Sequence, residues 1–370
     1  MIKEEIKAII FIVIVLLLTA GLAFLGIYIY MMQITIIEEE QIYQGNITIL
    51  SPFEKEEKKD KETSSQNILG SIEIEQTPEG VKDEKEYYYK QLNEYSKIIY
   101  DELAKNKENL KTGTYKIDFG DAFNELLSQE NGAQLLQENY QSGMETYLYD
   151  NPDVFYLDPT KMYINIQTTK KLFTTTYEVF IDQGTNSNYL AEGYTSKEQI
   201  LKHEEQIEQE VQKILEKVQG KTDYQKILTI HDYLVDNVAY EQTVTKYNIY
   251  NMYGAFVNKE AVCEGYAKAF KYLMDRVGIK CIVVIGVATD SKSETQNHAW
   301  NYVELEGVWY GIDVTWDDPI IIGGGRLGKN HRYKYFLKSS LTMSKDHTES
   351  STFVDGGKEY THPILSDSDY

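Results

Sequence analysis

Apolar residues recur at steps of three and four along several stretches of the chain, and alternate with polar residues along others. The first pattern predicts amphipathic helices, and the second predicts strands with one buried face. The predicted helices cover residues 92–103, 133–150, 196–220, 222–238 and 263–278. The predicted strands cover residues 162–167, 172–182, 281–288, 297–305 and 308–316. This mixture of elements is typical of an α+β fold.

The same patterns predict which faces are buried. On the strand 172–182, alternate residues share one face that we expect to be buried, namely Phe173, Thr175, Tyr177, Val179 and Ile181. The helix 222–238 carries His231 on its apolar stripe. A histidine in that position is more often a hydrogen-bonded core residue than a catalyst, and we expect the structural role here.

The longest apolar run lies at the N-terminus, where no charged residue occurs from Ala8 to Ile37. It exceeds the ~20 residues that a helix needs to cross a bilayer, and is about twice as long as the apolar region of a cleaved signal peptide. Lys3 and Lys7 precede the run and three glutamates follow it, which places the N-terminus in the cytoplasm. We therefore predict that residues 1–37 are an uncleaved transmembrane anchor and that the rest is extracellular.

The segment after the predicted anchor is rich in charge. Residues 54–62 read EKEEKKDKE, a run that cannot bury apolar surface and stays solvated. We expect residues 38–85 to be a charged extracellular stalk, followed by an α+β domain over 86–195. A second domain is expected over 196–350, and a tail over 351–370.

The charge balance limits the partners. The formal net charge is −21, which argues against a nucleic-acid partner because phosphate binding requires lysine and arginine. We expect no cofactor and no metal, since neither a CxxC pair nor a phosphate-binding loop is present. Asp317 and Asp318 could hold a cation, but we expect them to shape a loop. His331 and His347 are expected at the surface.

One of the two cysteines occupies a chemically favourable position. Cys263 lies in EAVCEGYAKAF, directly before a predicted helix, where unpaired N–H groups and the positive end of the helix dipole stabilise an anion. With a cationic neighbour, such a thiol can act as a thiolate nucleophile. The alternative is a disulfide to Cys281. The intervening helix would hold the two residues ~20 Å apart, whereas a disulfide needs Cα atoms within ~7 Å.

The predicted hairpin beyond this helix supplies partners for a thiolate. A two-residue turn at Glu306-Gly307 would pair Leu305 with Val308 and place Trp300 opposite Asp313. His298 is then the diagonal neighbour of Asp313 on the same face, within roughly 7–8 Å. An imidazole and a carboxylate would therefore lie together at the open end of the hairpin.

These stretches carry a family resemblance. AVCEGYAKAF and NHAWNYVELEGVWYGIDVTWDDP resemble the transglutaminase-like family of papain-type cysteine enzymes, over roughly residues 220–350. DNPDVFYLD at 150–158 also resembles the upstream domain of bacterial members anchored at the cell surface. The resemblance implies a nucleophile helix packed on an antiparallel sheet, with the small α+β domain before it. It also implies a catalytic triad of Cys263, His298 and Asp313. Tyr253 could be a second oxyanion donor or equally a packing aromatic.

The resemblance implies acyl transfer from a carboxamide or peptide carbonyl through a thioester. Three interpretations stay open. The first is a transferase that crosslinks surface proteins or cell-wall peptides, and the second is a cysteine peptidase or amidase that uses the same triad. The third is a non-catalytic cell-surface binding module. The intact triad argues against the third, and the sequence does not separate the first two.

Overall fold

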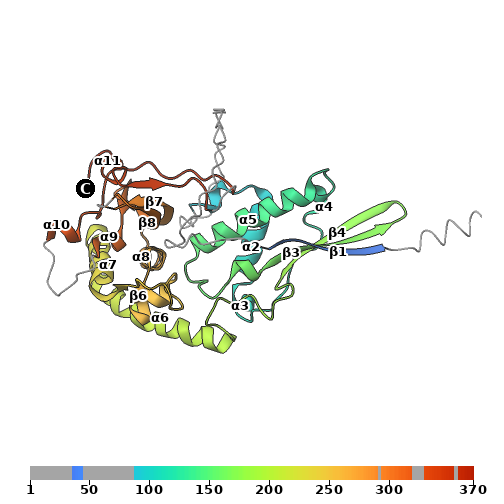
Figure 1. The fold of residues 1–370 in the computed structure, drawn as a ribbon, viewed down its shortest axis with the longest axis horizontal. Coiled ribbons are helices and arrows are strands. Elements are labelled where there is room, and N and C mark those ends of the chain that lie inside the picture. The colour runs from blue at the N-terminus through green and yellow to red at the C-terminus, as the bar shows by residue number, and fades with distance from the viewer. Residues whose placement is uncertain (1–35, 45–86, 291–292, 319–328, 354–356) are drawn as a thin grey trace, which may run out of the picture.

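Two four-stranded sheets organise the molecule. The computed structural model describes residues 36–44, 87–290, 293–318, 329–353 and 357–370. One sheet has the strand order β1-β3-β4-β2 and the other β10-β7-β8-β9, and a short pair joins β5 to β6. The two larger sheets lie toward opposite ends of the long axis, with α2 and α5 between them (Figure 1).

The N-terminal half is a helical layer packed on the first sheet. α5, from Gly132 to Asp150, packs against α2, Glu94–Lys105. α2 exposes one face to solvent, whereas α5 is buried on nearly every side from Asn139 onward. Asn93 begins α2 because its side chain accepts a hydrogen bond from the Ser96 amide. The remaining elements are η1 (Tyr89–Gln91), α3 (Lys107–Leu110), β2 (Ile117–Asp118), α4 (Asn124–Leu127), η2 (Pro159–Lys161), β3 (Tyr163–Lys171) and β4 (Thr174–Asp182).

The strand β1 corrects a predicted boundary. Residues Ile36–Gln44 pair antiparallel with β3, from Ile36 opposite Lys170 to Gln44 opposite Tyr163. The assignment of 36–37 to the anchor and of 38–44 to the stalk is therefore wrong. β1 is an edge strand of the first sheet, a position at which charged residues are common. Residues 1–35 lie outside the described residues, and no helix among those described is long and apolar enough to span a bilayer.

The predicted buried face of 172–182 is only half right. Val179 and Ile181 are fully buried, but Phe173 is 69% exposed and Thr175 is also exposed. The cause is the shape of the β3–β4 hairpin, whose tip projects beyond the helices that cover its base (Figure 1). The alternation of residues therefore identified the face of β4 that is buried near its end, but it could not show how far along the strand the helices cover that face.

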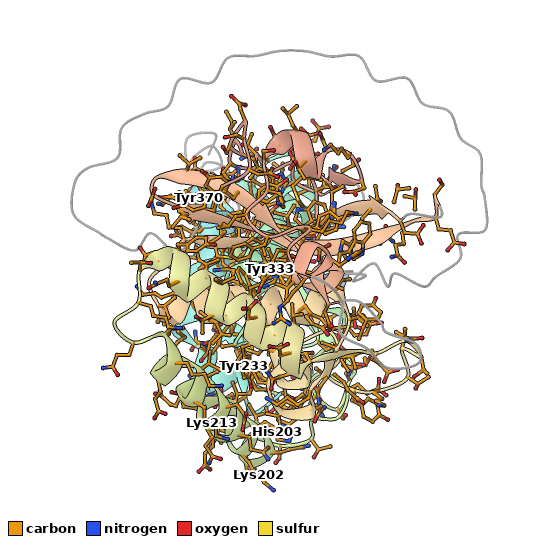
Figure 2. The ribbon with its side chains drawn as sticks, turned by 90° about the vertical axis from the view of Figure 1, so that its left-hand side faces the viewer. Lys202, His203, Lys213, Tyr233, Tyr333 and Tyr370 are labelled. Carbon is orange, nitrogen blue, oxygen red and sulfur yellow. The ribbon has the colours of Figure 1, made fainter. Side chains whose placement is uncertain are left out.

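The C-terminal half packs helices against the second sheet. α6 (Lys197–Val218) and α7 (Asp223–Asn237) lie in front when the molecule is seen from this end, with Tyr233 labelled on α7 (Figure 2). α8, Cys263–Arg276, packs on β7 and β8, and Asn301 Nδ2 donates to the Ala267 carbonyl at 3.0 Å. The other elements are β5 (Ala239–Tyr240), η3 (Gly254–Asn258), β6 (Glu260–Ala261), β7 (Cys281–Thr289), β8 (Thr295–Leu305), β9 (Val308–Ile312), α9 (Val314–Asp317), α10 (Lys329–Arg332), α11 (Ser340–Met343) and β10 (His347–Glu349).

The end of the chain is part of the fold and not a tail. Phe353, Tyr360 and Leu365 are buried, and the Tyr360 hydroxyl lies 2.8 Å from Thr146 Oγ1 on α5. Phe353 stacks on Tyr149 of the same helix at 4.2 Å between ring centroids. The predicted tail 351–370 is therefore wrong where it is described, because its aromatic residues fill the space between the two halves.

A buried carboxyl on α5 gives this packing a pH dependence. Glu145 is fully buried, which raises its pKa to about 7, and the Gln141 amide lowers it only in part. The folded chain therefore retains a proton that the unfolded chain releases near pH 4.5, so the unfolding free energy falls as pH rises from about 4.5 to about 7. We expect Glu145→Gln to raise the unfolding free energy at pH 8 by about 2–3 kcal/mol and to change little at pH 4. Denaturant unfolding at both pH values checks this, with exposed Glu138→Gln as the control, and an equal effect at both would contradict it.

Candidate active site

Cys263 is the first residue of α8. Its side chain is almost fully buried, at 3% exposure, and it lines a small cavity together with His298. The residue before it, Val262, offers no side-chain cap, so the first N–H groups of the helix are not satisfied in that way. Cys281 is also free, and burial raises the pKa of its thiol well above the ordinary value. The two thiols therefore occupy different environments, one at a helix N-terminus and one inside a strand.

The start of α8 depends on a glycine. A Cβ on Gly265 would lie 2.4 Å from the Ile249 carbonyl oxygen and 2.9 Å from the Ala261 side chain. No side chain fits at those distances, so glycine two positions after Cys263 lets the helix approach the preceding loop. The spacing C-x-G in the sequence thus has a packing cause.

His298 and Asp313 meet as the hairpin register predicts. Leu305 pairs with Val308, and His298 Nε2 lies 2.8 Å from Asp313 Oδ2. The second strand is shorter than predicted, because β9 ends at Ile312 and α9 begins directly after Asp313. Asp313 causes that change as the N-cap of α9, where its Oδ1 accepts from the Trp316 amide at 3.1 Å. One carboxylate therefore caps a helical turn and orients an imidazole.

The electrostatics favour a charged pair. Burial alone would lower the pKa of His298, but the charge of Asp313 and hydrogen bonds to Asp313 and Cys263 raise it to about 10. Burial alone would raise the pKa of Asp313, and the charge and hydrogen bond of His298, with a further hydrogen bond from His347, hold it well below its usual range. His298 is therefore an imidazolium at neutral pH. Since Nε2 is bonded to Asp313, Nδ1 is the nitrogen left for the thiol.

A second histidine was missed by sequence reasoning. His347, on β10, is buried and not at the surface as predicted, and its Nε2 lies 3.1 Å from the same Asp313 Oδ2. Its Nδ1 lies 2.8 Å from Asp346 Oδ1, so both ring nitrogens face carboxylates. Three aromatic rings surround it at centroid distances of 5.0, 4.7 and 5.1 Å, those of Trp300, Trp316 and Tyr335. The Asp-His dipeptide at 346–347 was the available signal, but its distance along the chain from Asp313 hid the contact.

His298, Asp313 and His347 also offer three possible metal ligands within 4.8 Å of one another. Their contacts have the lengths of hydrogen bonds, at 2.8 and 3.1 Å from each Nε2 to Asp313 Oδ2. Ligand atoms around a tetrahedral zinc would be about 3.3 Å apart, because each bond is about 2.0 Å long. We therefore interpret the cluster as a hydrogen-bonded network.

Tyr253 does not join this group. Its hydroxyl donates to Gln206 Oε1 at 3.0 Å and its ring stacks on His203 at 3.9 Å, so it packs against α6, where His203 is labelled in Figure 2. Tyr240, at the end of β5, lies closer to the chemistry. Burial, and then the charges of Cys263 and Asp313, raise the pKa of Tyr240. Its hydroxyl is therefore a candidate donor within electrostatic range of the thiol, which the Tyr253 hydroxyl is not.

The remaining polar candidates have structural roles. His231 is fully buried and its Nε2 lies 3.1 Å from Asp317 Oδ2, which makes it the hydrogen-bonded core histidine that was expected. Asp317 Oδ1 also accepts from the Tyr335 amide at 2.8 Å, and Asp318 accepts from the Tyr266 hydroxyl. Both aspartates therefore fix the segment after Asp313, as the loop-shaping interpretation predicted.

A family model matches the part of the chain that carries the predicted triad. Residues 211–314, which include Cys263, His298 and Asp313, match the model of the transglutaminase-like superfamily. The chain contains a transglutaminase-like domain. Its mixed α+β architecture is built around that core, with α8 packed on an antiparallel sheet.

Curated relatives share only this part of the chain. The kyphoscoliosis peptidase of Mus musculus is 30% identical over 93 residues, or 23% of this chain and 14% of the relative. The human kyphoscoliosis peptidase is 35% identical over 66 residues, or 16% of this chain and 10% of the relative. The chain therefore spans about a seventh or less of these relatives.

Solved structures show a distant likeness. A crystal structure of a TGase is 15% identical with a TM-score of 0.28, and covers 40% of this chain and 44% of its own. The periplasmic domain of TgpA from Pseudomonas aeruginosa is 12% identical with a TM-score of 0.24, and covers 42% of this chain and 69% of its own.

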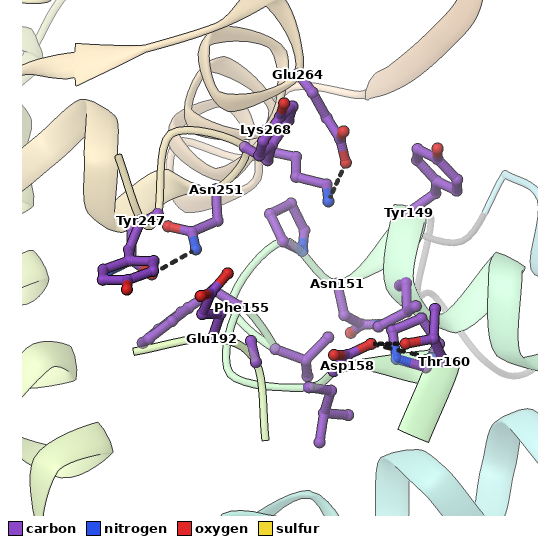
Figure 3. Close-up of a pocket in the computed structure, with 18 of the residues that line it drawn as sticks. Tyr149, Asn151, Phe155, Asp158, Thr160, Glu192, Tyr247, Asn251, Glu264 and Lys268 are labelled. Atoms are coloured by element: carbon purple, nitrogen blue, oxygen red, sulfur yellow. Dashed lines mark hydrogen bonds and ion pairs between the residues drawn. The ribbon is translucent and has the colours of Figure 1, made fainter. Parts of the chain in front are cut away.

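Two cavities adjoin the nucleophile of the transglutaminase-like domain. A narrow one of about 30 Å³ holds Cys263 and His298 under Tyr149, Tyr250 and Phe353. A larger one of about 500 Å³ lies beside it, between the two halves of the chain (Figure 3). The residues that line both are Tyr149, Tyr250 and Glu264.

His347 should act on the chemistry through Asp313. We expect His347→Ala to lower kcat/KM by about 10- to 100-fold with little change in KM, because Asp313 loses one of the donors that hold it. His347→Gln, whose amide can donate to Asp313, should recover part of the loss. The pH profile of Cys263 alkylation should also change in the alanine variant, which a purely structural role would not produce. His331→Ala, at an exposed position, is the control, and an unchanged profile in His347→Ala would contradict the prediction.

Proposed function

We propose that the protein is a membrane-anchored, extracellular cysteine enzyme that transfers acyl groups from carboxamide or peptide carbonyls. The arrangement of Cys263, His298 and Asp313 carries this proposal. The thiol stands at a helix N-terminus beside an imidazolium that a buried carboxylate orients through Nε2. These are the parts that an activated thiolate requires.

The chemistry follows from these positions. The Cys263 thiolate attacks the carbonyl carbon, and the oxyanion of the tetrahedral intermediate is met by N–H groups at the start of α8 and by the Tyr240 hydroxyl. His298 gives its Nδ1 proton to the departing amine or ammonia, which leaves a thioester on Cys263. An amine or a water then attacks the thioester, and His298 takes up the proton that the attacking group releases. Asp313 stabilises the imidazolium and keeps its charge throughout.

The same residues also support a peptidase or amidase in which water is the acceptor. The two relatives described above are named kyphoscoliosis peptidase, which favours this second candidate. Incorporation of a labelled amine without hydrolysis would select the transferase, and cleavage of a peptide would select the peptidase. A binding module that does no chemistry would show neither.

The proposed location rests on the N-terminal sequence. The uncharged run from Ala8 to Ile37 has the length of a membrane span, and the two lysines before it favour a cytoplasmic N-terminus. Surface proteins or cell-wall peptides are then the accessible substrates. Protease treatment of intact cells tests this, because an extracellular domain is cleaved and a cytoplasmic one is protected.

Alkylation of the full-length chain tests the nucleophile. Iodoacetamide should label Cys263 in preference to Cys281, and His298→Ala should slow the labelling of Cys263 at neutral pH by at least about tenfold, because the imidazolium is lost. Since the pKa of His298 is about 10, wild type and variant should converge as pH rises through that value. Mass spectrometry locates the label, and His331→Ala is the control. Equal rates in wild type and His298→Ala at pH 7 would remove the support for acyl transfer.

A further inference from the structure

We propose that the cleft between the two halves of the chain binds an extended, basic polypeptide segment of the substrate, next to the carbonyl that Cys263 attacks. This inference rests on the proposed function and names the substrate segment that the site would select. It also gives the N-terminal half a role in recognition.

The cleft has walls from both halves. Residues 151–160, which follow α5, form one wall together with Glu192. Residues 244–251 and the first turns of α8, with Glu264 and Lys268, form the opposite wall. Figure 3 shows Phe155 and Glu192 on one side, Tyr247 and Asn251 facing them, and Lys268 beside Glu264. A volume of about 500 Å³ lies in the usual range of ligand sites.

The cleft leads to the nucleophile. Tyr149, Tyr250 and Glu264 line both this cleft and the narrow cavity of about 30 Å³ that holds Cys263. Glu264 is the residue directly after Cys263. The narrow cavity has room for little more than a water-sized group, so only the reacting carbonyl group reaches the thiol. The rest of the substrate must lie outside it, and the larger cleft is the adjoining space.

The charge around the cleft favours a basic segment. Carboxylates outnumber ammonium groups in and beside it: Asp158, Glu192, Glu241, Glu260 and Glu264 against Lys161, Lys246 and Lys268. Both lysines that line it are already paired. Lys268 lies 2.5 Å from Glu264, and Lys246 lies 3.0 Å from Glu241. Glu192 is exposed and forms no ion pair with another described residue. A cation therefore finds an available carboxylate, whereas an anion finds none of the lining lysines unpaired.

The lining also fits a polypeptide. Asn151 Oδ1 accepts no hydrogen bond from another described residue and Asn248 Nδ2 donates none, so these two amides can bond a peptide backbone. Phe155 and Pro152 add apolar surface to the lining. Tyr247, at 57% exposure, is an aromatic side chain at the rim that a bound side chain can cover. Alternating amide and apolar contacts suit an extended chain, whose side chains point in alternate directions.

Peptide binding to the full-length chain tests the proposal. The probes are two fluorescein-labelled peptides with one central glutamine, flanked by lysines in the first and by glutamates in the second. Cys263→Ser is used so that no turnover occurs, and fluorescence anisotropy measures Kd. We expect the lysine peptide to bind about tenfold more tightly than the glutamate peptide, and its Kd to rise with salt.

A matched pair of variants tests whether the peptide binds in the cleft. Glu192→Lys should weaken binding of the lysine peptide by about three- to tenfold. Glu130→Lys makes the same change of charge on an exposed turn of the same half, away from both cavities, and should leave Kd unchanged. Tyr247→Ala should weaken binding of both peptides. Equal binding of the two peptides, or an equal effect of Glu192→Lys and Glu130→Lys, would overturn the proposal.

This test fails separately from that of the proposed function. Peptide binding is measured without the thiol, and alkylation of Cys263 is measured without a peptide. If Cys263 is alkylated in a His298-dependent way but the two peptides bind equally, only the proposal that the cleft binds basic segments is contradicted. Selective peptide binding combined with an inert thiol contradicts acyl transfer, and leaves the cleft as a binding site for basic segments.

Discussion

Asp313→Ala is expected to lower kcat/KM for acyl transfer by about three orders of magnitude. Its Oδ2 accepts from the Nε2 atoms of His298 and His347 at 2.8 and 3.1 Å, and its Oδ1 caps α9. Alanine removes both functions and the negative charge that keeps His298 protonated. Removal of an orienting carboxylate from such a triad costs about 10³–10⁴ in rate. Steady-state kinetics with a labelled amine acceptor, or with a peptide if the enzyme is a hydrolase, measures the loss.

Asp313→Asn separates orientation from charge. The amide oxygen can still accept from His298, so the imidazole stays in place, but no charge remains to stabilise the imidazolium. We expect a loss of about 10²-fold, between wild type and alanine. The asparagine NH₂ would also face the Trp316 amide in place of an acceptor, which should lower stability by about 1–2 kcal/mol. Equal rates in wild type and Asp313→Asn would show that the charge of Asp313 is not needed.

Gly286→Ala is expected to disrupt the sheet beside the active site. A Cβ at Gly286 would lie 2.1 Å from the Thr348 carbonyl oxygen and 2.9 Å from the Glu349 Cα. Both atoms belong to the backbone of β10, which pairs Glu349 with Gly286 and His347 with Ala288. The strand must shift to admit the methyl group, and it carries His347 with it. We expect unfolding to become easier by about 3 kcal/mol or more, and activity to fall as His347 leaves Asp313.

The control for Gly286→Ala is its neighbour on β7, Val287. Val287 is 37% exposed, so Val287→Ala should change the free energy of unfolding by less than about 1 kcal/mol. Thermal or denaturant unfolding gives the two values under the same conditions. Equal changes in the unfolding free energy of Gly286→Ala and Val287→Ala would contradict the prediction, because they would show that β10 accommodates a methyl group at position 286.

The sequence located the local parts of the site and missed the distant ones. Cys263 was placed by a helix start, and the His298–Asp313 contact by a two-residue turn, because both signals lie close to the residues they position. The turn could not show where β9 ends, since Asp313 is compatible with a strand residue and with an N-cap. His347 reaches Asp313 only because β10 pairs with β7, which lies far from it in sequence. No local pattern contains that pairing.

The N-terminal strand shows a similar limit. Residues 36–44 read as the end of an apolar run followed by glutamates, and their pairing with β3 joins positions more than a hundred residues apart. The two cavities were also beyond the sequence, because their walls come from α5, residues 244–251 and α8 together. Sequence patterns predicted helices and strands and where they end, but contacts between residues that are distant in sequence were seen only in the structure.

The pairing of β1 changes how far the enzyme can reach from a bilayer. Residues 45–86 connect Gln44, which pairs with Tyr163, to the buried Tyr88, and both of these residues belong to the folded unit. Because both ends of this segment are fixed in the same folded unit, its length does not set the distance between the bilayer and the Cys263 thiol. In the proposed orientation that distance is set by the folded sheet, because β1 begins opposite Lys170, near the tip of the hairpin. Shortening residues 45–86 should therefore leave the distance from the bilayer to Cys263 unchanged.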